Sequence, residues 1–320
     1  MMAKPALVVI AGATATGKSD TAIEVAKRIG GEIVSADSMQ VYRGMDIGTG
    51  KVMPQEMQGV PHHLIDVCGP DDAYDLARYA ADASEAIRGI LERGRIPILC
   101  GGTGFYIQAV TKGIAFDEAS PSEDLRKELL EEARTEGNEA LHRRLCEVDP
   151  ASAAAIHPNN VKRVIRALEY YRLTGSPISE KNAREKTQES PYHVISFLIE
   201  LPRPELYRRI DLRVDRMMED GLVEEVRRLA GCGLTKKDVS MQGLGYKEIL
   251  AYLAGECTLE EAVYILKRDT RHFAKRQLTW FRTDSVSERL DRLSFDDSTE
   301  KMGAYIADAI LAKTAEAEGK

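Results

Sequence analysis

Eight residues near the start of the chain, GATATGKS from Gly12 to Ser19, have the types and spacing that bind phosphate groups. They fit G-x-x-x-x-G-K-S/T, in which the glycines let the backbone turn with its N–H groups facing inward. Lys18 can neutralise the terminal phosphates, and the Ser19 hydroxyl can ligate a Mg²⁺ ion held between phosphate oxygens. The sequence therefore predicts a site for a di- or triphosphate. The residues of this site are Gly12, Ala13, Thr14, Ala15, Thr16, Gly17, Lys18 and Ser19.

The segments on either side of this loop have the patterns that the motif requires. ALVVIA, residues 6–11, is a run of small and β-branched apolar residues that is typical of a buried strand. The segment after the loop places Ala22, Ile23, Ala26 and Ile29 at helical spacing. A helix that begins near Lys18 would direct the positive end of its dipole toward a bound anion. The loop is thus predicted to connect a strand to a helix.

Further segments in the first part of the chain alternate between strand and helix patterns. Strands are predicted for EIVSAD, HLIDV and IPILCGG, and a helix is predicted for YDLARYAADASEAIRGILERG. This alternation predicts an α/β fold, in which a parallel sheet like that of the P-loop NTPases is flanked by helices.

We predict three parts along the chain. Residues 1–115 form the first part of the P-loop α/β core, and residues 116–190 form an all-helical, heavily charged insertion. Residues 191–320 return to the core and end in C-terminal helices. HVISFLIEL, residues 193–201, is the strand that returns to the sheet, and the chain after Pro204 is predicted to be mainly helical.

Two polar segments follow predicted strands, at the edge of the sheet where ligands bind in open α/β folds. Asp37 and Ser38 follow EIVSA, and the Asp37 carboxylate could act as a general base, as a magnesium ligand or simply as the cap of a turn. GGTG, Gly101 to Gly104, follows IPILC and opens a helix, so Thr103 offers a hydroxyl beside the ligand or caps the helix.

Composition limits the classes of function. A net charge of −7 excludes the global basic field of a nonspecific nucleic-acid binder, so any nucleic-acid surface must be local. The five cysteines are scattered without a C-x-x-C pair, which argues against a zinc site or a disulfide framework and suits a reducing cytoplasm. His62 and His63 are adjacent, so in a strand they would point to opposite faces, and no third metal ligand follows at a recognisable spacing. We expect no signal peptide and no membrane span, since the N-terminal apolar run is only a few residues long.

Two predicted helices collect positive charge on one face. The first carries Lys162, Arg163, Arg166 and Tyr170 opposite an apolar face of Val161, Val164, Ile165 and Leu168. The second carries Arg268, Arg271, Lys275 and Arg282 opposite Phe273, Gln277 and Trp280, with few acidic residues nearby. We interpret both faces as contacts for RNA, the alternative being ordinary solvated helix surfaces.

Seven motifs occur in order between about Leu7 and Arg282: GATATGKS, VSADSMQVYRGMDIGTGK, HHLIDV, GGTGFYIQAV, NNVKRVIRALEYYRLTG, MQGLGYKE and AKRQLTWFR. Together they closely resemble the tRNA dimethylallyltransferases, also called tRNA isopentenyltransferases. The resemblance implies transfer of the dimethylallyl group of dimethylallyl diphosphate to N6 of the adenosine on the 3′ side of the anticodon in tRNA, with release of diphosphate. No cysteine-histidine zinc finger follows Arg282, so the chain resembles the bacterial members.

The resemblance also implies roles for individual residues. Asp37 would accept the N6 proton, Lys18 and Arg213 would bind the diphosphate, and Thr103 would contact the target nucleotide. We therefore predict Lys18, Asp37 and Thr103 as catalytic residues, with Ser19 as the protein ligand of Mg²⁺. The implied tRNA contacts are Asp37, Ser38, Met39, Gln40, Thr103, Arg126, Asn159, Asn160, Val161, Lys162, Arg163 and Arg166.

Three other functions share parts of this pattern. An enzyme that prenylates free AMP, ADP or ATP would use the same loop and general base, but would not need the basic helices. A P-loop kinase of a small metabolite would use Asp66 in HLIDV as its second acidic residue. A nucleotide-dependent binding module without transfer chemistry would leave Asp37 and Thr103 without a role. The chain is expected to act as a monomer, with no obligate protein partner.

Overall fold

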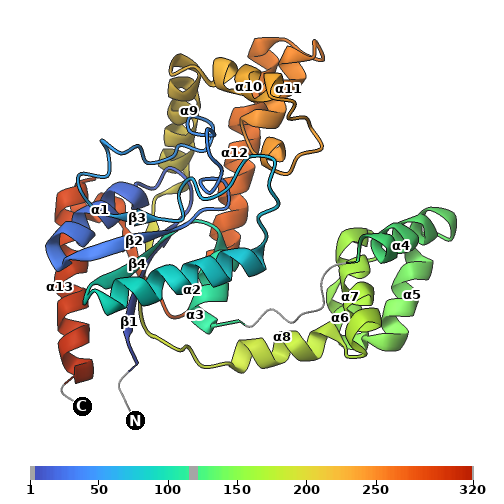
Figure 1. Ribbon diagram of the computed structural model, residues 1–320, viewed down its shortest axis with the longest axis horizontal. Helices are drawn as coiled ribbons and strands as arrows, with labels where there is room; N and C mark the ends of the chain where they lie inside the picture. Colours follow the sequence, from blue (N-terminus) through green and yellow to red (C-terminus); the bar gives the residue numbers. More distant parts are fainter. Residues whose placement is uncertain (1–3, 115–121, 319–320) are drawn as a thin grey trace. The chain divides into compact units, whose positions relative to one another are not determined.

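The computed structural model describes residues 4–114 and 122–318, which fall into two compact units (Figure 1). One unit comprises residues 1–113 together with residues 190–320, and the other comprises residues 114–189. The expected boundary between residues 115 and 116 lies outside the described residues. The second unit is therefore an insertion between two parts of the first.

The larger unit is built on a parallel sheet with the strand order β3-β2-β4-β1-β5-β6. The strands are β1 Ala6–Gly12, β2 Gly31–Ala36, β3 His62–His63, β4 Ile96–Gly101, β5 His193–Glu200 and β6 Glu288–Asp291. β1 pairs with β4 on one side and with β5 on the other, so strands from both sides of the insertion meet at the centre of the sheet. The predicted α/β fold is confirmed.

Helices cover both faces of this sheet (Figure 1). The helices of this unit are α1 Lys18–Ile29, α2 Leu76–Glu92, α3 Gly104–Lys112, α9 Arg203–Glu219, α10 Leu222–Gly231, α11 Tyr246–Leu253, α12 Leu259–Phe281 and α13 Thr299–Glu318, with 3₁₀ turns η1 Ser240–Gln242 and η2 Arg292–Phe295. Successive side chains of a strand point to opposite faces. Val8 and Ile10 thus belong to one cluster with α1 and α13, whereas Leu7 and Val9 belong to another with α2, α3 and α9 to α12.

Two predictions about strands need correction. Only the first residue of HLIDV, His63, lies in a strand, as the second residue of β3, because Leu64 and Asp66 have φ values of 62° and 56°, outside the β region. The chain after Pro204 is mainly helical but contributes the edge strand β6, which was not predicted. β6 has the sequence ERLD, and only Leu290 is buried, so it lacks the apolar alternation by which strands are recognised.

The smaller unit is helical and has its own core. Its helices are α4 Glu123–Thr135, α5 Asn138–Val148, α6 Pro150–Ala155, α7 Val161–Thr174 and α8 Ile178–Thr187. The buried side chains that form its core include Leu129, Leu141, Leu145, Val164 and Leu168. In the described ranges 4–114 and 122–318, none of the helices combines the length and the apolar character that crossing a membrane requires.

Candidate active site

The phosphate loop of residues 12–19 connects β1 to α1. Ala15 and Gly17 have φ values of 64° and 81°, left-handed conformations that turn successive N–H groups into a concave anion site. A Cβ atom on Gly12 would lie 2.9 Å from the carbonyl oxygen of Ile199, so this turn accepts only glycine. No side chain caps the N-terminus of α1, which leaves its first N–H groups available to an anion.

Two cations reach this loop without a carboxylate partner. Lys18 Nζ lies 3.4 Å from the carbonyl oxygen of Ala13. The Arg213 guanidinium, from α9, lies 3.2 Å from the carbonyl oxygen of Thr49 and 3.5 Å from Thr14 Oγ1. Neither side chain forms an ion pair with any residue that the structure describes. A bound anion would supply the missing partner of both.

Burial acts on both charges. It lowers the pKa of Lys18 and of Arg213, although the carboxylates of Asp37 and Asp20 act in the opposite direction. Removing a charge from water without a counter-ion costs free energy, and binding an anion recovers part of that cost. The charges at the loop are therefore arranged for an anionic ligand that the protein itself does not provide.

The Asp37 carboxylate lies just past the end of β2, in a turn held from a second strand. Asp37 Oδ1 accepts a hydrogen bond from the backbone N–H of Met39 at 2.9 Å. Thr103 Oγ1 accepts one from the N–H of Ser38 at 3.2 Å, and the N–H of Thr103 donates to the carbonyl oxygen of Ala36 at 3.1 Å. Thr103 directly precedes α3 but does not cap it with its side chain. Its hydroxyl instead fixes the turn that carries Asp37.

A cavity of about 330 Å³ collects most of these groups. The predicted site residues that line it are Thr14, Lys18, Ser19, Asp37, Ser38, Met39, Gln40, Thr103 and Arg213. Its apolar lining includes Ile210, Val214, Leu244, Leu266 and Phe273. A second, larger cleft of about 1200 Å³ also reaches the loop, where Ala15, Gly17, Lys18, Ser19 and Arg213 line it. The lining of the smaller cavity thus combines the partly buried cations Lys18 and Arg213, the exposed cations Lys247 and Arg276, the Asp37 carboxylate and an apolar surface.

Sequence reasoning missed Gln277 of α12, which joins the two glycine-containing loops. Its side chain is 7% exposed. Gln277 Oε1 accepts from the N–H of Thr14 at 2.9 Å, and Nε2 donates to the carbonyl oxygen of Gly102 at 2.9 Å. A glutamine on the apolar face of a predicted helix was the available signal, since a buried amide requires partners.

Sequence reasoning also missed Glu225 of α10. Glu225 holds residues 46–48, which lead to the Thr49 carbonyl oxygen that Arg213 contacts. Its carboxylate accepts hydrogen bonds from the backbone N–H groups of Asp46, Ile47 and Gly48 at 2.9, 2.9 and 3.1 Å. Tyr246 donates a fourth at 2.7 Å. The segment then places Gly50 so close to Arg213 that a Cβ atom would clash with its guanidinium.

Asp66 does not lie at the phosphate loop. Its carboxylate binds Lys51 Nζ at 2.5 Å, and Lys51 also donates to Asp46 at 2.6 Å and to the carbonyl oxygen of Tyr42 at 2.8 Å. Asp66 lines neither cavity. This position disfavours the kinase alternative, in which Asp66 would act beside the phosphates.

The two adjacent histidines have separate partners. His62 Nδ1 lies 2.8 Å from the carbonyl oxygen of Val60, and burial lowers its pKa. His63 Nε2 lies 2.7 Å from Glu32, which also binds Arg93. The described residues contain no group of three metal-ligating side chains around them.

The basic face of α7 differs from the predicted one. Tyr170 is 4% exposed and lies in the interior, so it offers no surface for stacking. Arg166 is not free, because it binds the buried Glu169 at 3.0 Å, and Arg126 of α4 binds the other oxygen of the same carboxylate at 2.8 Å. The buried surface of α7 is wider than the predicted apolar face, and it includes Glu169 and Tyr170.

The other predicted tRNA contacts of this unit lie at or near the start of α7. Lys162 and Arg163 are exposed and form no ion pair within the described part of the chain. Asn160 precedes the helix, and Asn159 Oδ1 accepts a hydrogen bond from Asn138 at 3.3 Å. Val161 is partly buried against the core.

Helix α12 also carries less free charge than predicted. Arg271 binds Asp211 of α9 at 2.5 Å, and Arg268 binds Asp269 at 2.8 Å. Lys275 and Arg282 are exposed and have no ion-pair partner among the described residues. Two of the four cations predicted for this face are therefore paired, one with the neighbouring Asp269 and one with Asp211 of another helix.

Comparison with known proteins decides the family. Residues 40–284 match the model of the family described as IPP transferase, and residues 5–69 match that of the Isopentenyl transferase family. The chain belongs to the IPP transferase family. It is 56% identical over 278 residues to the tRNA dimethylallyltransferase of Lachnoclostridium phytofermentans, covering 87% of this chain and 89% of that protein. It is 51% identical over 307 residues to the enzyme of the same name from Heliobacterium modesticaldum, covering 93% and 96%.

Solved structures of the IPP transferase family agree. The full-length tRNA isopentenylpyrophosphate transferase of Bacillus halodurans is 43% identical, with a TM-score of 0.74 and coverage of 99% of this chain and 98% of that one. A eukaryotic dimethylallyltransferase acting on tRNA is 30% identical, with a TM-score of 0.82 and coverage of 97% and 80%. The family predicted from the seven motifs is confirmed. The roles assigned to individual residues stay predictions.

Proposed function

We propose that this chain transfers the dimethylallyl group of dimethylallyl diphosphate to N6 of the adenosine on the 3′ side of the anticodon in tRNA, releasing diphosphate. One observation carries the proposal: the partly buried cations Lys18 and Arg213, which have no ion-pair partner among the described residues, line the same cavity as the Asp37 carboxylate. The family membership and the names of the relatives support it.

The donor would bind with its diphosphate on the phosphate loop and its five-carbon chain on the apolar lining. Lys18 and Arg213 would stabilise negative charge on the leaving diphosphate as the C1–O bond breaks. That stabilisation increases as charge develops, so it lowers the barrier and does not only tighten binding.

Magnesium is part of the proposal. Ser19 lines both cavities, and the described residues hold no cluster of three ligating side chains, so the protein would supply few ligands. This fits Mg²⁺, which keeps several waters and binds through substrate phosphates. The ion would add positive charge at the diphosphate, while Ser19 would orient it.

The acceptor nitrogen needs a base. The N6 amine is conjugated with the adenine ring and is a poor nucleophile, so removal of its proton assists the attack on C1. Asp37 Oδ1 is occupied by the N–H of Met39, which leaves Oδ2 to accept that proton. As the N6–C1 bond forms, the electron pair of the C1–O bond leaves with the diphosphate. Ser38, Met39, Gln40 and Thr103 would border the adenine, which must leave its stack to reach the cavity.

The helical unit is proposed to bind the anticodon stem-loop. Lys162 and Arg163 offer free positive charge, and Arg126 and Arg166 are each about half exposed although both bind Glu169. Asn159, Asn160 and Val161 lie beside them. Phosphates of the RNA would contact the exposed edges of these cations.

One assay separates the alternatives. Labelled dimethylallyl diphosphate is incubated with unmodified tRNA, with AMP, or with ATP and no tRNA. Label in tRNA alone is expected. Label in AMP would support the free-nucleotide enzyme, and ADP released from ATP without prenyl transfer would support the kinase.

We further propose that the enzyme acts as a monomer in the cytoplasm. The five cysteines are all free thiols, which suits a reducing compartment. A mass consistent with one chain in analytical ultracentrifugation, at concentrations where the enzyme is active, would support a monomer, whereas activity confined to a dimer would contradict it.

A further inference from the structure

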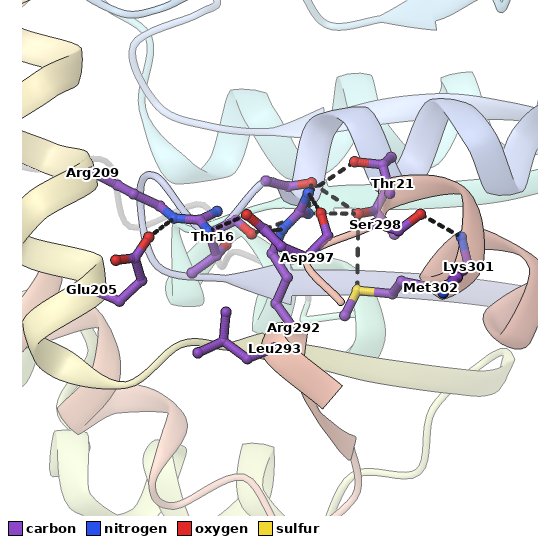
Figure 2. A network of polar contacts seen from close by, with 12 residues as sticks. Thr16, Thr21, Glu205, Arg209, Arg292, Leu293, Asp297, Ser298, Lys301 and Met302 are labelled. Atoms are coloured by element: carbon purple, nitrogen blue, oxygen red, sulfur yellow. Dashed lines mark hydrogen bonds and ion pairs between the residues drawn. The ribbon is translucent and has the colours of Figure 1, made fainter. Parts of the chain in front are cut away.

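An arginine beyond the family-matched residues 40–284 contacts the phosphate loop and lines the larger cleft beside it. Arg292, in η2, is 6% exposed. Figure 2 shows its side chain beside the loop, where Nη1 lies 3.5 Å from each of three oxygens, the carbonyl oxygens of Thr16 and Gly17 and the hydroxyl of Thr21. A Cβ atom on Gly17 would collide with the guanidinium. Arg292 therefore packs directly against the loop.

The rest of the guanidinium is held by the turn before α13. Arg292 Nε donates to Asp297 Oδ1 at 2.5 Å (Figure 2). Nη2 donates to Thr299 Oγ1 at 2.9 Å. Asp296 and Asp297 have φ values of 53° and 58°, a left-handed conformation that is uncommon for residues other than glycine. Two such residues in succession form an unfavourable turn that is kept by the contacts it makes.

Asp297 also connects this turn to α9. Its Oδ2 accepts from Arg209 Nη2 at 2.7 Å, and Arg209 is held on the other side by Glu205 at 2.7 Å (Figure 2). Arg213 follows Arg209 by four residues, about one turn of the same helix. The Asp297 carboxylate thus links Arg292, which contacts the loop, to the helix that supplies Arg213.

The contacts of Arg292 have a direct effect on the N–H groups of the loop. A trans peptide unit is planar, so its C=O and the following N–H point in opposite directions. Carbonyl oxygens of Thr16 and Gly17 that face Arg292 therefore direct the N–H groups of Gly17 and Lys18 away from it. A fixed orientation of these dipoles lowers the cost of binding an anion.

We propose that Arg292 is a positioning residue for the diphosphate site, which orients the N–H groups of the phosphate loop and, through Asp297 and Arg209, sets the loop against the helix that carries Arg213. The inference rests on the proposed function. It assigns a role in donor binding to the segment that follows the family-matched region. It predicts no role for this segment in binding tRNA.

The test compares Arg292→Gln with Arg289→Gln. Arg289 is the matched control, because it lies on the same segment and binds Glu200 and the carbonyl oxygen of Phe281, both at 2.7 Å, without touching the loop. Affinities for inorganic pyrophosphate and for dimethylallyl diphosphate are measured by calorimetry with Mg²⁺ and without tRNA, and the tRNA dissociation constant is measured separately. Thermal unfolding without ligand shows whether each variant is folded.

For Arg292→Gln we expect diphosphate affinity to fall about 10-fold, the size of one lost charged hydrogen bond, with the tRNA dissociation constant within about two-fold of wild type. For Arg289→Gln we expect both affinities to match wild type. Unchanged diphosphate affinity of Arg292→Gln, or an equal loss in Arg289→Gln, would overturn the inference. If Arg292→Gln does not fold, Asp297→Asn is measured in its place. A fall in diphosphate affinity of less than about 10-fold supports the inference, and an unchanged diphosphate affinity overturns it. Wild-type protein that binds neither diphosphate would overturn the proposed function as well.

Discussion

Replacement of Arg213 by methionine is expected to stabilise the ligand-free protein slightly while weakening its binding of diphosphate. Arg213 is partly buried, has no ion pair with a described residue, and its guanidinium lies beside two neutral oxygens at 3.2 and 3.5 Å. Methionine keeps an unbranched apolar stem and has no charge to desolvate. We therefore expect the free energy of unfolding to be unchanged or to rise by about 1 kcal/mol, as is common when a functional group is replaced by a better-packed one.

The effect on binding has the opposite sign. A hydrogen bond to a charged group contributes about 1.5–3 kcal/mol, so the pyrophosphate dissociation constant should rise about 10- to 150-fold. Pyrophosphate at about 100 times the wild-type constant stabilises the wild-type fold by about 2.7 kcal/mol. If the constant of the variant is about 30-fold higher, the same concentration stabilises the variant by only about 0.9 kcal/mol.

Thermal unfolding with and without pyrophosphate measures both effects. For a domain of about the size of the larger unit, 1 kcal/mol corresponds to about 2–4 °C in Tm, so ligand should raise Tm by about 5–10 °C in wild type and about 2–4 °C in the variant. Arg203→Met is the control, because Arg203 is an exposed residue of the same helix and lines neither cavity. A lower Tm without ligand together with a normal ligand-induced rise would refute the reasoning and make Arg213 a structural residue.

Three further outcomes test other parts of the site. Asp37→Asn should reduce single-turnover transfer about 10²- to 10⁴-fold with both substrates still bound, and recovery on adding Mg²⁺ would instead assign Asp37 as a metal ligand. Gln277→Leu should lower kcat/KM for dimethylallyl diphosphate about 10-fold, since Thr14 and Gly102 lose their link, and normal kinetics would contradict this role. Burial would raise the pKa of Glu169, but hydrogen bonds from Arg126 and Arg166 hold it below its ordinary value of 4.5. The Glu169 carboxylate therefore contributes fully to stability above pH 4.5, and this contribution is lost as the pH falls through its lowered pKa in the folded protein. The free energies of unfolding of wild type and Glu169→Gln should differ above pH 4.5 and converge in acid. Parallel curves over the whole range would argue against this ion pair.

The sequence was sufficient to predict those parts of the site whose backbone conformation depends on a short local pattern. The phosphate loop needs its glycines at fixed positions, so strand, loop and helix follow from GATATGKS and its flanks. The same holds for the turns after β2 and β4, which bring Asp37 and Thr103 to one cavity. In each case the chemistry depends on residues that are close in sequence or on the shared edge of a parallel sheet.

Side-chain contacts that depend on tertiary packing could not be predicted from the sequence. Arg166 and Arg271 looked free because their partners depend on tertiary packing: Glu169 turns inward and Asp211 belongs to another helix. Gln277 gave a weak signal, and Arg292 gave none, since the strand that leads to it has almost no apolar pattern. Helical spacing identifies which residues share a face, but it does not say which element covers that face.

The position of β1 in the sheet affects how the chain matures during synthesis. Its two neighbours are β4, complete at Gly101, and β5, which begins at His193. A nascent chain therefore carries the apolar strand ALVVIAG with one unpaired edge while the ribosome makes the whole helical insertion. At the usual elongation rate of 5–20 residues per second, the edge stays open for roughly 5–20 s. Such an edge can pair with other chains, so chaperones have that interval in which to shield β1, and a translational pause within the insertion would lengthen the exposure without changing the finished enzyme.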